Sequence, residues 1–457
     1  MQRGRTDVRL ACRARIAGAV SIRPIIYNAL PDSTPALAGR DGSGLVAGVD
    51  LGTTSIAAAI IDPSNGLELG RSSVPNPQAT FGADVLARLS AALEGRAGEL
   101  RELAVQGILN ALRSATDAAG VSLDRVERLA IAGNTAMAAL LVGADVATLA
   151  VHPFTPPEMG RALPAESELR YCLAGDADAV VVPAIASFVG GDALAATLSA
   201  GMIEAAEPML LVDFGTNAEI VLAGAGALVV ASAAAGPAFE GVGVSCGGPA
   251  VDGAVTRVRI AQDGSVMLDS IGSGAPQWFS GSGLVSAVAE LRRHGHLDAS
   301  GLLCADGPLS ARFARSEGGV LAVGLGEDES GCLVLTQLDV RALQLAKAAV
   351  RVGIEAVLSE GGVAAADLGS VLVAGAFGSA LEPADLIGLG ILPVGVAEKT
   401  HRVGNASLEG AAVIALDPGI IELALTTASA AVHVDLALDP GFARALVAAT
   451  EFVTYSS

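Results

Sequence analysis

The sequence predicts a large α/β protein made of two duplicated lobes. A strand that runs into Asp-x-Gly-Thr occurs twice, and the two copies lie 163 positions apart. A helical segment rich in small residues occurs in each half, at 193–201 and at 404–411. Hydrophobic residues make up 52% of the 457 residues but aromatic residues only 3%, so Ala, Val, Leu and Gly must fill the cores. Such a composition suits closely stacked helices and sheets and argues against general disorder.

The first copy of the pattern begins with the apolar segment Leu45–Val49 and continues through Asp50, Leu51 and Gly52. Thr53 and Thr54 complete the turn, and the apolar residues 56–61 follow. This pattern predicts a β-hairpin, and a glycine in its turn lets a ligand approach the backbone closely.

The second copy begins with the apolar segment 209–212 and places Asp213, Gly215 and Thr216 at the same offsets as Asp50, Gly52 and Thr53. The apolar residues 220–222 again follow the turn. A single Asp-x-Gly-Thr is a weak signal because many tight turns contain it. Two copies on matching strands at a domain-scale separation are a strong one.

A chemical reason explains why such a turn occurs twice. Backbone N–H groups and Thr hydroxyls of two facing turns can donate to the oxygens of a polyphosphate. Asp50 and Asp213, at the strand ends, would hold a hydrated Mg²⁺, which takes few carboxylates and keeps several waters. We therefore expect the phosphates to be bound by Gly52, Thr53, Thr54, Gly215, Thr216 and Asn217.

Asp192 follows an apolar segment and two glycines, at the start of a predicted helix over 193–201. Its carboxylate can orient an attacking water as a hydrogen-bond acceptor or base. It can equally be the N-cap of the helix, the commonest role of Asp at such a position. The sequence leaves both interpretations open.

Two further segments complete a resemblance to the actin, Hsp70 and sugar-kinase superfamily, whose two lobes have ribonuclease-H-like folds and enclose a nucleotide cleft. Residues 371–379 resemble its adenosine-binding loop, and 404–411 resemble its second connecting helix. The resemblance assigns the adenosine to Gly375, Ala376, Phe377 and Gly378. Between these segments and the second turn, a helical pattern covers 336–360. Lys347 on that helix is interpreted either as a phosphate ligand or as part of a solvated face.

A narrower group of motifs resembles the reductive activators of corrinoid proteins. The motifs occur in that family's order from about residue 45 to 452: Asn76-Pro77-Gln78, Gly82-Ala83-Asp84-Val85, Gly133-Asn134-Thr135-Ala136-Met137, His152-Pro153-Phe154, Ala234–Gly241, Gly281-Ser282-Gly283-Leu284 and Leu335–Arg341. A departure is Ala218, which replaces the glycine usual in the family's Asn-Gly-Glu.

The resemblance implies an ATPase that supports the reduction of a corrinoid (cobalamin) methyltransferase protein from Co(II) to Co(I). ATP and Mg²⁺ would be its cofactors. Asp50, Asp192 and Asp213 would be its catalytic residues. Two other functions stay open: a nucleotide-sensing binding module or scaffold, and a small-molecule kinase, for which no acceptor signature is found.

Many members of that family carry an N-terminal iron–sulfur domain with clustered cysteines. The five cysteines here show no CxxC or CxxxC spacing. We therefore expect no iron–sulfur cluster in this chain and a separate ferredoxin or flavodoxin as electron donor. Cys246, in a glycine-rich loop, is interpreted as a functional thiol or as a small core residue.

Charge and hydropathy exclude two classes of partner. A formal net charge of −20 argues against non-specific nucleic-acid binding, which needs Lys and Arg to neutralise phosphates. The uncharged segment 220–239 is long enough to span a membrane, but its glycines and Pro237 predict strand, turn, strand and loop instead. We expect a cytoplasmic protein with reduced thiols, and long apolar helices offer a homodimer interface as an alternative to core packing.

The sequence divides into four parts. Residues 1–44 are rich in arginine and are interpreted as a disordered tail, a transit peptide or the product of a start codon placed too far upstream. Residues 45–205 and 206–416 are expected to form the two lobes, and 417–457 a C-terminal extension.

Overall fold

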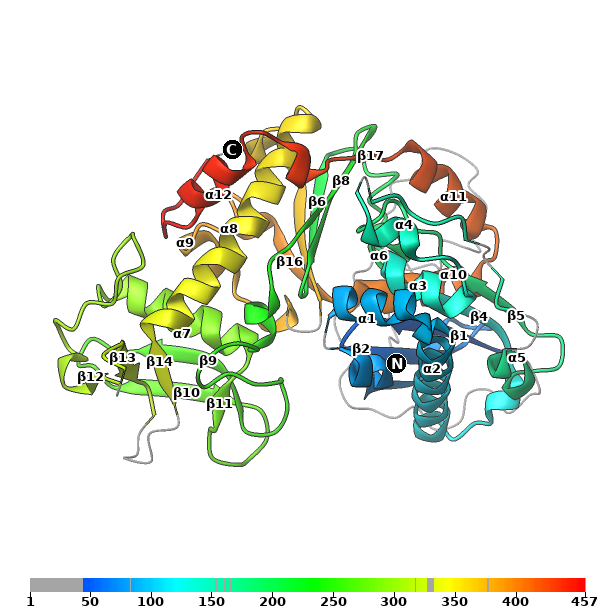
Figure 1. The fold of residues 1–457 in the computed structure, drawn as a ribbon, viewed down its shortest axis with the longest axis horizontal. Helices are drawn as coiled ribbons and strands as arrows, with labels where there is room; N and C mark the ends of the chain where they lie inside the picture. The colour runs from blue at the N-terminus through cyan, green and yellow to red at the C-terminus, as the bar shows by residue number, and fades with distance from the viewer. Residues whose placement is uncertain are drawn as a thin grey trace, which may run out of the picture. The chain divides into compact units, whose positions relative to one another are not determined.

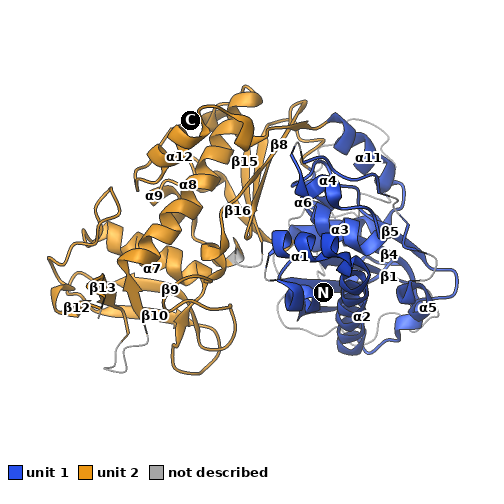
Figure 2. Ribbon diagram, viewed as in Figure 1, with its two compact units in different colours: residues 1–201, 406–430 blue, residues 202–405, 431–457 orange. Residues whose placement is uncertain are grey.

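The computed structural model describes residues 44–456, apart from 83, 153, 160–161, 165–166, 317, 327–332 and 376–377. The arginine-rich tail therefore lies outside the described residues. The chain forms two compact units (Figure 2). The first unit contains residues up to Gly201 and Ala406–Ala430. The second contains Met202–Asn405 and Ala431–Ser457.

A five-stranded sheet forms the centre of the first unit, in the order β3-β2-β1-β4-β5. β1 is antiparallel to β2, which is antiparallel to β3, whereas β4 and β5 run parallel to β1. The strands are β1 (Leu45–Leu51), β2 (Ser55–Asp62), β3 (Leu67–Pro75), β4 (Val126–Gly133) and β5 (Asp178–Val181).

Helices cover both faces of this sheet. Alternate residues of β1 and β2 pack with α2 in one apolar cluster, and the intervening residues pack with α6 and α10 in another. This period of two explains why both strands are nearly continuously apolar. The helices of the unit are α1 (Val85–Ala91), α2 (Ala97–Ala119), α3 (Thr135–Val142), α4 (Ala147–Ala150), α5 (Glu168–Cys172), α6 (Gly191–Ser199), α10 (Ala406–Leu416) and α11 (Ile420–Ala430) (Figure 1).

The main sheet of the second unit repeats the first. Its order, β16-β15-β6-β7-β8-β17, contains the same arrangement of antiparallel and parallel neighbours, with β17 added at one edge. The predicted duplicated α/β fold is confirmed. The strands are β6 (Met209–Phe214), β7 (Ala218–Gly224), β8 (Ala227–Ala233), β15 (Ser370–Ala374), β16 (Thr400–Gly404) and β17 (Val432–His433).

The long helix α8 packs on β7 and β8 of this sheet and shares their apolar cluster. It begins with a capping box between Thr336 and Asp339. The other helices are α7 (Gly281–Arg293), α9 (Pro383–Gly388) and α12 (Phe442–Ala449), and α8 itself is Gln337–Glu360. Two small sheets contain β9 (Ala254–Ile260), β10 (Val266–Ser270) and β11 (Trp278–Phe279), and β12 (Phe313–Arg315), β13 (Leu321–Gly324) and β14 (Val334–Thr336).

The segment 220–239 forms most of β7, then β8 and a glycine loop, as predicted. Among the described residues, no helix has the length and apolar character needed to cross a membrane.

The compact units divide the chain differently from the expected linear lobes. Helix α10, expected in 206–416, packs tightly on α6 because Gly410 has no side chain: a Cβ there would lie 2.0 Å from the Ala195 carbonyl oxygen.

Candidate functional site

In the first unit, Asp50 lies at the end of β1 and meets the start of α10. The Ser407 hydroxyl donates to Asp50 Oδ1 at 3.0 Å, and Ser407 itself is buried. The close approach of the helix depends on Gly48, where a Cβ would lie 2.5 Å from the Ala412 backbone nitrogen. A serine that begins a returning helix thus completes the surroundings of the predicted carboxylate.

The second carboxylate of this unit belongs to Asp192, in the first turn of α6. Burial, and then the negative charge of Asp50, raise its pKa to about 7. The side chain accepts a 2.8 Å hydrogen bond from the Ala193 backbone N–H. The N-cap interpretation of Asp192 is wrong, because Gly190 occupies the cap position. Asp50 and Asp192 therefore form a pair of mutually repelling carboxylates, and the role of Asp192 toward a water stays a prediction.

The first predicted phosphate turn is held by its carbonyl groups. Asn76 Nδ2 donates to the Gly52 carbonyl at 2.8 Å, and an Arg88 N–H donates to the Thr53 carbonyl at 2.7 Å. The Asn76 backbone N–H donates to the Thr54 carbonyl at 2.9 Å. Three consecutive carbonyls of the turn are thus bound by neighbouring segments. In addition, Asn134 Nδ2 donates to the Thr53 hydroxyl at 3.0 Å.

In the second unit, Asp213 occupies the position on β6 that Asp50 occupies on β1. The turn that follows it, Gly215–Asn217, is held by the glycine loop after β8. The Thr216 hydroxyl donates to Glu240 Oε1 at 2.7 Å, and its carbonyl accepts from the Gly236 N–H at 2.8 Å. The two turns are therefore supported in the same way, by polar groups from later segments of their own unit.

Gly375 brings the predicted adenosine loop to Asp213. It has a φ of 99°, and a Cβ at this position would lie 2.8 Å from Asp213 Oδ1 and 2.4 Å from the Phe214 carbonyl oxygen. Only glycine combines this conformation with such a close approach. Gly378, three residues further along the chain, is buried. Ala376 and Phe377 lie outside the described residues.

The structure thus groups the predicted residues within each unit: Asp50, Asp192 and the turn 52–54 in the first, and Asp213, the turn 215–217 and Gly375 in the second. Sequence reasoning missed the polar residues that support them, namely Asn76, Arg88, Asn134, Glu240 and Ser407. The signal was present for four of them, since Asn76, Asn134 and Glu240 stand inside the family-like motifs and Ser407 stands inside the segment 404–411. No local pattern marks Arg88.

The donor set around Asp50 fits magnesium. Asp50 and Asp192 offer hard carboxylate oxygens, and the repulsion between them favours a cation nearby. Among the described residues, no group of three or more His, Cys, Asp or Glu could hold a metal by itself. Magnesium does not need one, because it binds through one or two carboxylates together with phosphates and waters.

Two other predicted features lie away from these residues. Lys347 is fully buried, so the solvated-face interpretation is wrong. Its ammonium donates to the Glu451 carbonyl and lies 5.3 Å from the centre of the Phe452 ring. The alternative of a phosphate ligand gains no support from these contacts. Cys246 is half-buried and packs against the core of the second unit.

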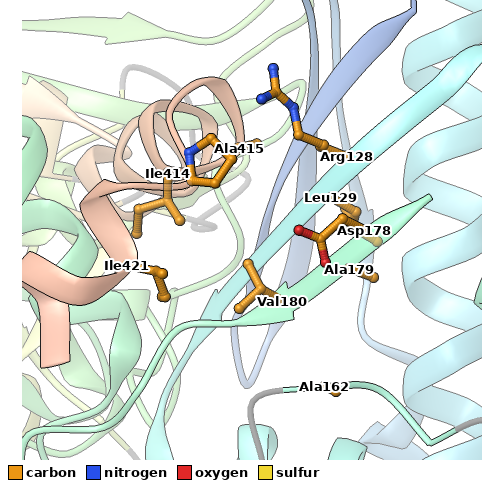
Figure 3. A pocket seen from close by; sticks show the side chains of 10 residues that line it. Arg128, Leu129, Ala162, Asp178, Ala179, Val180, Ile414, Ala415 and Ile421 are labelled. Carbon is orange, nitrogen blue, oxygen red and sulfur yellow. The ribbon is translucent and has the colours of Figure 1, made fainter. Parts of the chain in front are cut away.

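A cavity of about 400 Å³ in the first unit is also separate from the site (Figure 3). Its polar lining residues, Arg128 and Asp178, stand near the beginnings of β4 and β5 and are register partners. Asp50 pairs instead with Ala132, four residues further along β4, which is roughly 13 Å away along a strand. The cavity therefore lies toward the opposite end of the strands from Asp50.

Comparisons with known proteins agree with this architecture. Residues 45–205 match the model of the RACo middle region, and residues 207–457 match that of the C-terminal domain of RACo, the ASKHA domain.

Named relatives cover most of the chain. The corrinoid activation enzyme RamQ of Eubacterium limosum is 29% identical over 422 residues, which are 88% of this chain and 69% of the relative. The [Co(II) methylated amine-specific corrinoid protein] reductase of Methanosarcina barkeri is 27% identical over 410 residues, 82% of this chain and 71% of the relative. A solved structure of a reductive activator for a corrinoid, iron–sulfur protein superposes with a TM-score of 0.80 at 30% identity. It covers 91% of this chain and 67% of that one.

Proposed function

Because the chain belongs to the RACo family, we propose that it is an ATP-dependent reactivator of a corrinoid protein, and that it supports the reduction of Co(II) to Co(I). One observation supports this most strongly. The two turns, each preceded by an aspartate near the end of a strand, occupy equivalent places in two duplicated sheets. The two family models each cover one of these turns. The relatives named for corrinoid activation and for Co(II) corrinoid protein reduction support the same reaction.

The energetic problem is an electron transfer that runs uphill. Each ~1.4 kcal/mol of free energy supplied to a one-electron couple shifts its reduction potential by about 59 mV. ATP binding and hydrolysis can supply this free energy if nucleotide-dependent conformations of the activator bind the corrinoid protein with different affinities. The activator would then favour the state of the partner in which Co(II) accepts one electron and becomes Co(I).

The residues of the site divide the work of ATP hydrolysis. The N–H groups and hydroxyls of turns 52–54 and 215–217 bind the phosphates, and the Gly375–Gly378 loop lies near the adenosine. Asp50 and Asp213 would hold magnesium, which neutralises charge on the phosphates when bound. Asp192 accepts a hydrogen bond from the attacking water, whose oxygen bonds to the γ-phosphorus as the bond to the β-phosphate oxygen breaks.

The electron comes from a separate donor of the ferredoxin or flavodoxin class. The five cysteines of this sequence show neither CxxC nor CxxxC spacing. The partner is a corrinoid methyltransferase protein, and the reaction takes place in the cytoplasm, where thiols stay reduced.

The decisive experiment measures steady-state ATP hydrolysis with and without each corrinoid methyltransferase protein of the host in its Co(II) state. A low-potential chemical reductant is included, and Co(I) is followed by its absorbance. We expect one corrinoid protein to stimulate hydrolysis and to become Co(I) only with ATP, and we expect Asp213→Ala to lose both. Nucleotide binding without a response to any corrinoid protein would instead favour the sensor or scaffold function.

A further inference from the structure

Arg88, on α1, is a fully buried arginine whose guanidinium reaches the first phosphate turn. One N–H donates to the Thr53 carbonyl at 2.7 Å, and Nε donates to the Gly82 carbonyl at 3.1 Å. A third N–H reaches Gln78 Oε1 and the Met137 sulfur, both at 3.3 Å. The guanidinium is therefore held on several sides and presents one donor to the turn.

The hydrogen bond from Arg88 to the Thr53 carbonyl determines the orientation of the Thr53–Thr54 peptide. A trans peptide is planar, so its carbonyl and its N–H point in opposite directions. The Gly52 carbonyl points to Asn76 and the Thr53 carbonyl points to Arg88. The N–H groups of the same two peptides, those of Thr53 and Thr54, consequently point to the other side of the turn. Arg88 thus sets the direction of the Thr54 N–H.

The charge of Arg88 is also unusual. Among the described residues it makes no ion pair, because its hydrogen bonds go to carbonyls, an amide oxygen and a sulfur. The negative charge of Asp84 favours the protonated guanidinium, and its carboxylate caps the start of α1 by accepting from the Ala87 N–H. Burial lowers the pKa of Arg88 to about 10, so the group stays protonated at neutral pH. A buried cation without a carboxylate partner favours an anion close by.

We infer that Arg88 is a positioning residue for the phosphates: it orients the Thr53–Thr54 peptide toward them and places a positive charge behind the turn. This rests on the proposed function, since it deepens the role of the same nucleotide site. This role differs from that of an exposed lysine or arginine that contacts the phosphates directly. Arg88 acts from the interior of the unit, through the Thr53 carbonyl.

The test is calorimetric titration of the full chain with ATP, ADP, AMP and adenosine at neutral pH in the presence of Mg²⁺. We expect Arg88→Met to weaken ATP binding at least tenfold and ADP binding less, with adenosine binding unchanged. Arg88→Lys keeps the charge but cannot form the forked contacts, so we expect a smaller loss for ATP, about threefold, with the same order among the ligands.

Lys347→Met is the matched control. It also removes a fully buried cation that donates to a carbonyl, but in the second unit and at the C-terminal segment. We expect it to leave the dependence of affinity on phosphate number unchanged. Circular dichroism establishes which variants fold. If Arg88→Met does not fold, the binding measurements on Arg88→Lys still test the inference.

The outcomes separate the two proposals. If the wild-type chain binds none of the three nucleotides, the proposed function fails, whatever Arg88 does. If the wild type binds ATP and folded Arg88 variants bind all four ligands as tightly, the inference is overturned. It is also overturned if they weaken all four ligands equally, because that result indicates a structural role alone.

Discussion

The Ser407 hydroxyl donates to the Asp50 carboxylate at 3.0 Å although the two residues are 357 positions apart. Ser407 lies in the first turn of α10, which packs on β1 and α6 within the first unit. The contact joins a strand at the beginning of the unit to a helix that enters it after the whole middle of the chain. The proposed magnesium ligand is therefore oriented by a residue that no local pattern connects with it.

Replacement of Ser407 should reduce ATP turnover. In Ser407→Ala the Asp50 carboxylate loses a hydrogen bond, and hydrogen bonds to charged groups contribute about 1.5–3 kcal/mol. We expect kcat to fall roughly tenfold or more and the free energy of unfolding to fall by up to about 1.5–3 kcal/mol. Ser199→Ala is the control, because its hydroxyl binds the Ala406 carbonyl at 3.1 Å and does not contact Asp50. Equal losses in both variants would contradict a specific role for Ser407.

Replacement of Gly375 should damage the second half of the site. Gly375→Ala forces a Cβ against Asp213 and Phe214 in addition to its unfavourable φ of 99°. We expect a loss of nucleotide binding and a destabilisation of about 3 kcal/mol, since overpacking adds to the strain. Gly395→Ala is matched: its φ is 85° and its Cβ would meet nothing within 4 Å, so it should cost only about 1–2 kcal/mol. Urea denaturation and ATP titration measure both effects. Normal ATP affinity in folded Gly375→Ala would refute the assigned place of the loop.

Lys347 should make stability depend on pH. Burial, and then the charge of Arg351, lower its pKa to about 7 from the ordinary 10.5. Between these values the unfolded chain binds more protons than the folded one, so stability from this group rises with pH across that window. The slope approaches about 1.4 kcal/mol per pH unit at most. The penalty is fully present below pH 7.

Urea denaturation at pH 7, 8 and 9 tests this prediction. We expect the wild-type free energy of unfolding to rise relative to that of Lys347→Met as pH increases. Because all other titrating groups are shared, the difference between the two proteins isolates Lys347. Parallel pH profiles would mean that Lys347 titrates near its ordinary pKa.

The packing of α6 against α10 should tolerate no added methyl group. Gly410→Ala places a Cβ 2.0 Å from the Ala195 carbonyl oxygen, and we expect a loss of about 3 kcal/mol or non-folding. Gly98→Ala makes the same change in α2, where nothing lies within 4 Å. It should stabilise by about 0.5–1 kcal/mol because alanine has the higher helix propensity. Thermal unfolding ranks the variants, and a Gly410→Ala protein as stable as the wild type would contradict the packing.

Much of the fold could be predicted from the sequence because local patterns encode it. The apolar segments and turn glycines around Asp50 and Asp213 specify hairpins, and their equal offsets indicate the duplication. The spacing of apolar residues predicted the helix 337–360 almost to its ends. Each of these signals depends on residues a few positions apart, so no distant contact is needed to read it.

The supporting residues were decided only by tertiary structure. Lys347 looks like any lysine on a helix, and its burial depends on the Glu451 carbonyl, 104 positions away. Arg88 reaches Thr53 because α1 packs beside the first turn, and Ser407 reaches Asp50 because the chain returns to the first unit. The sequence alone determined which backbone turns exist and where their aspartates stand. Which polar groups hold those turns depends on how distant segments pack, because a hydrogen-bond partner is chosen by position in space and not by spacing along the chain.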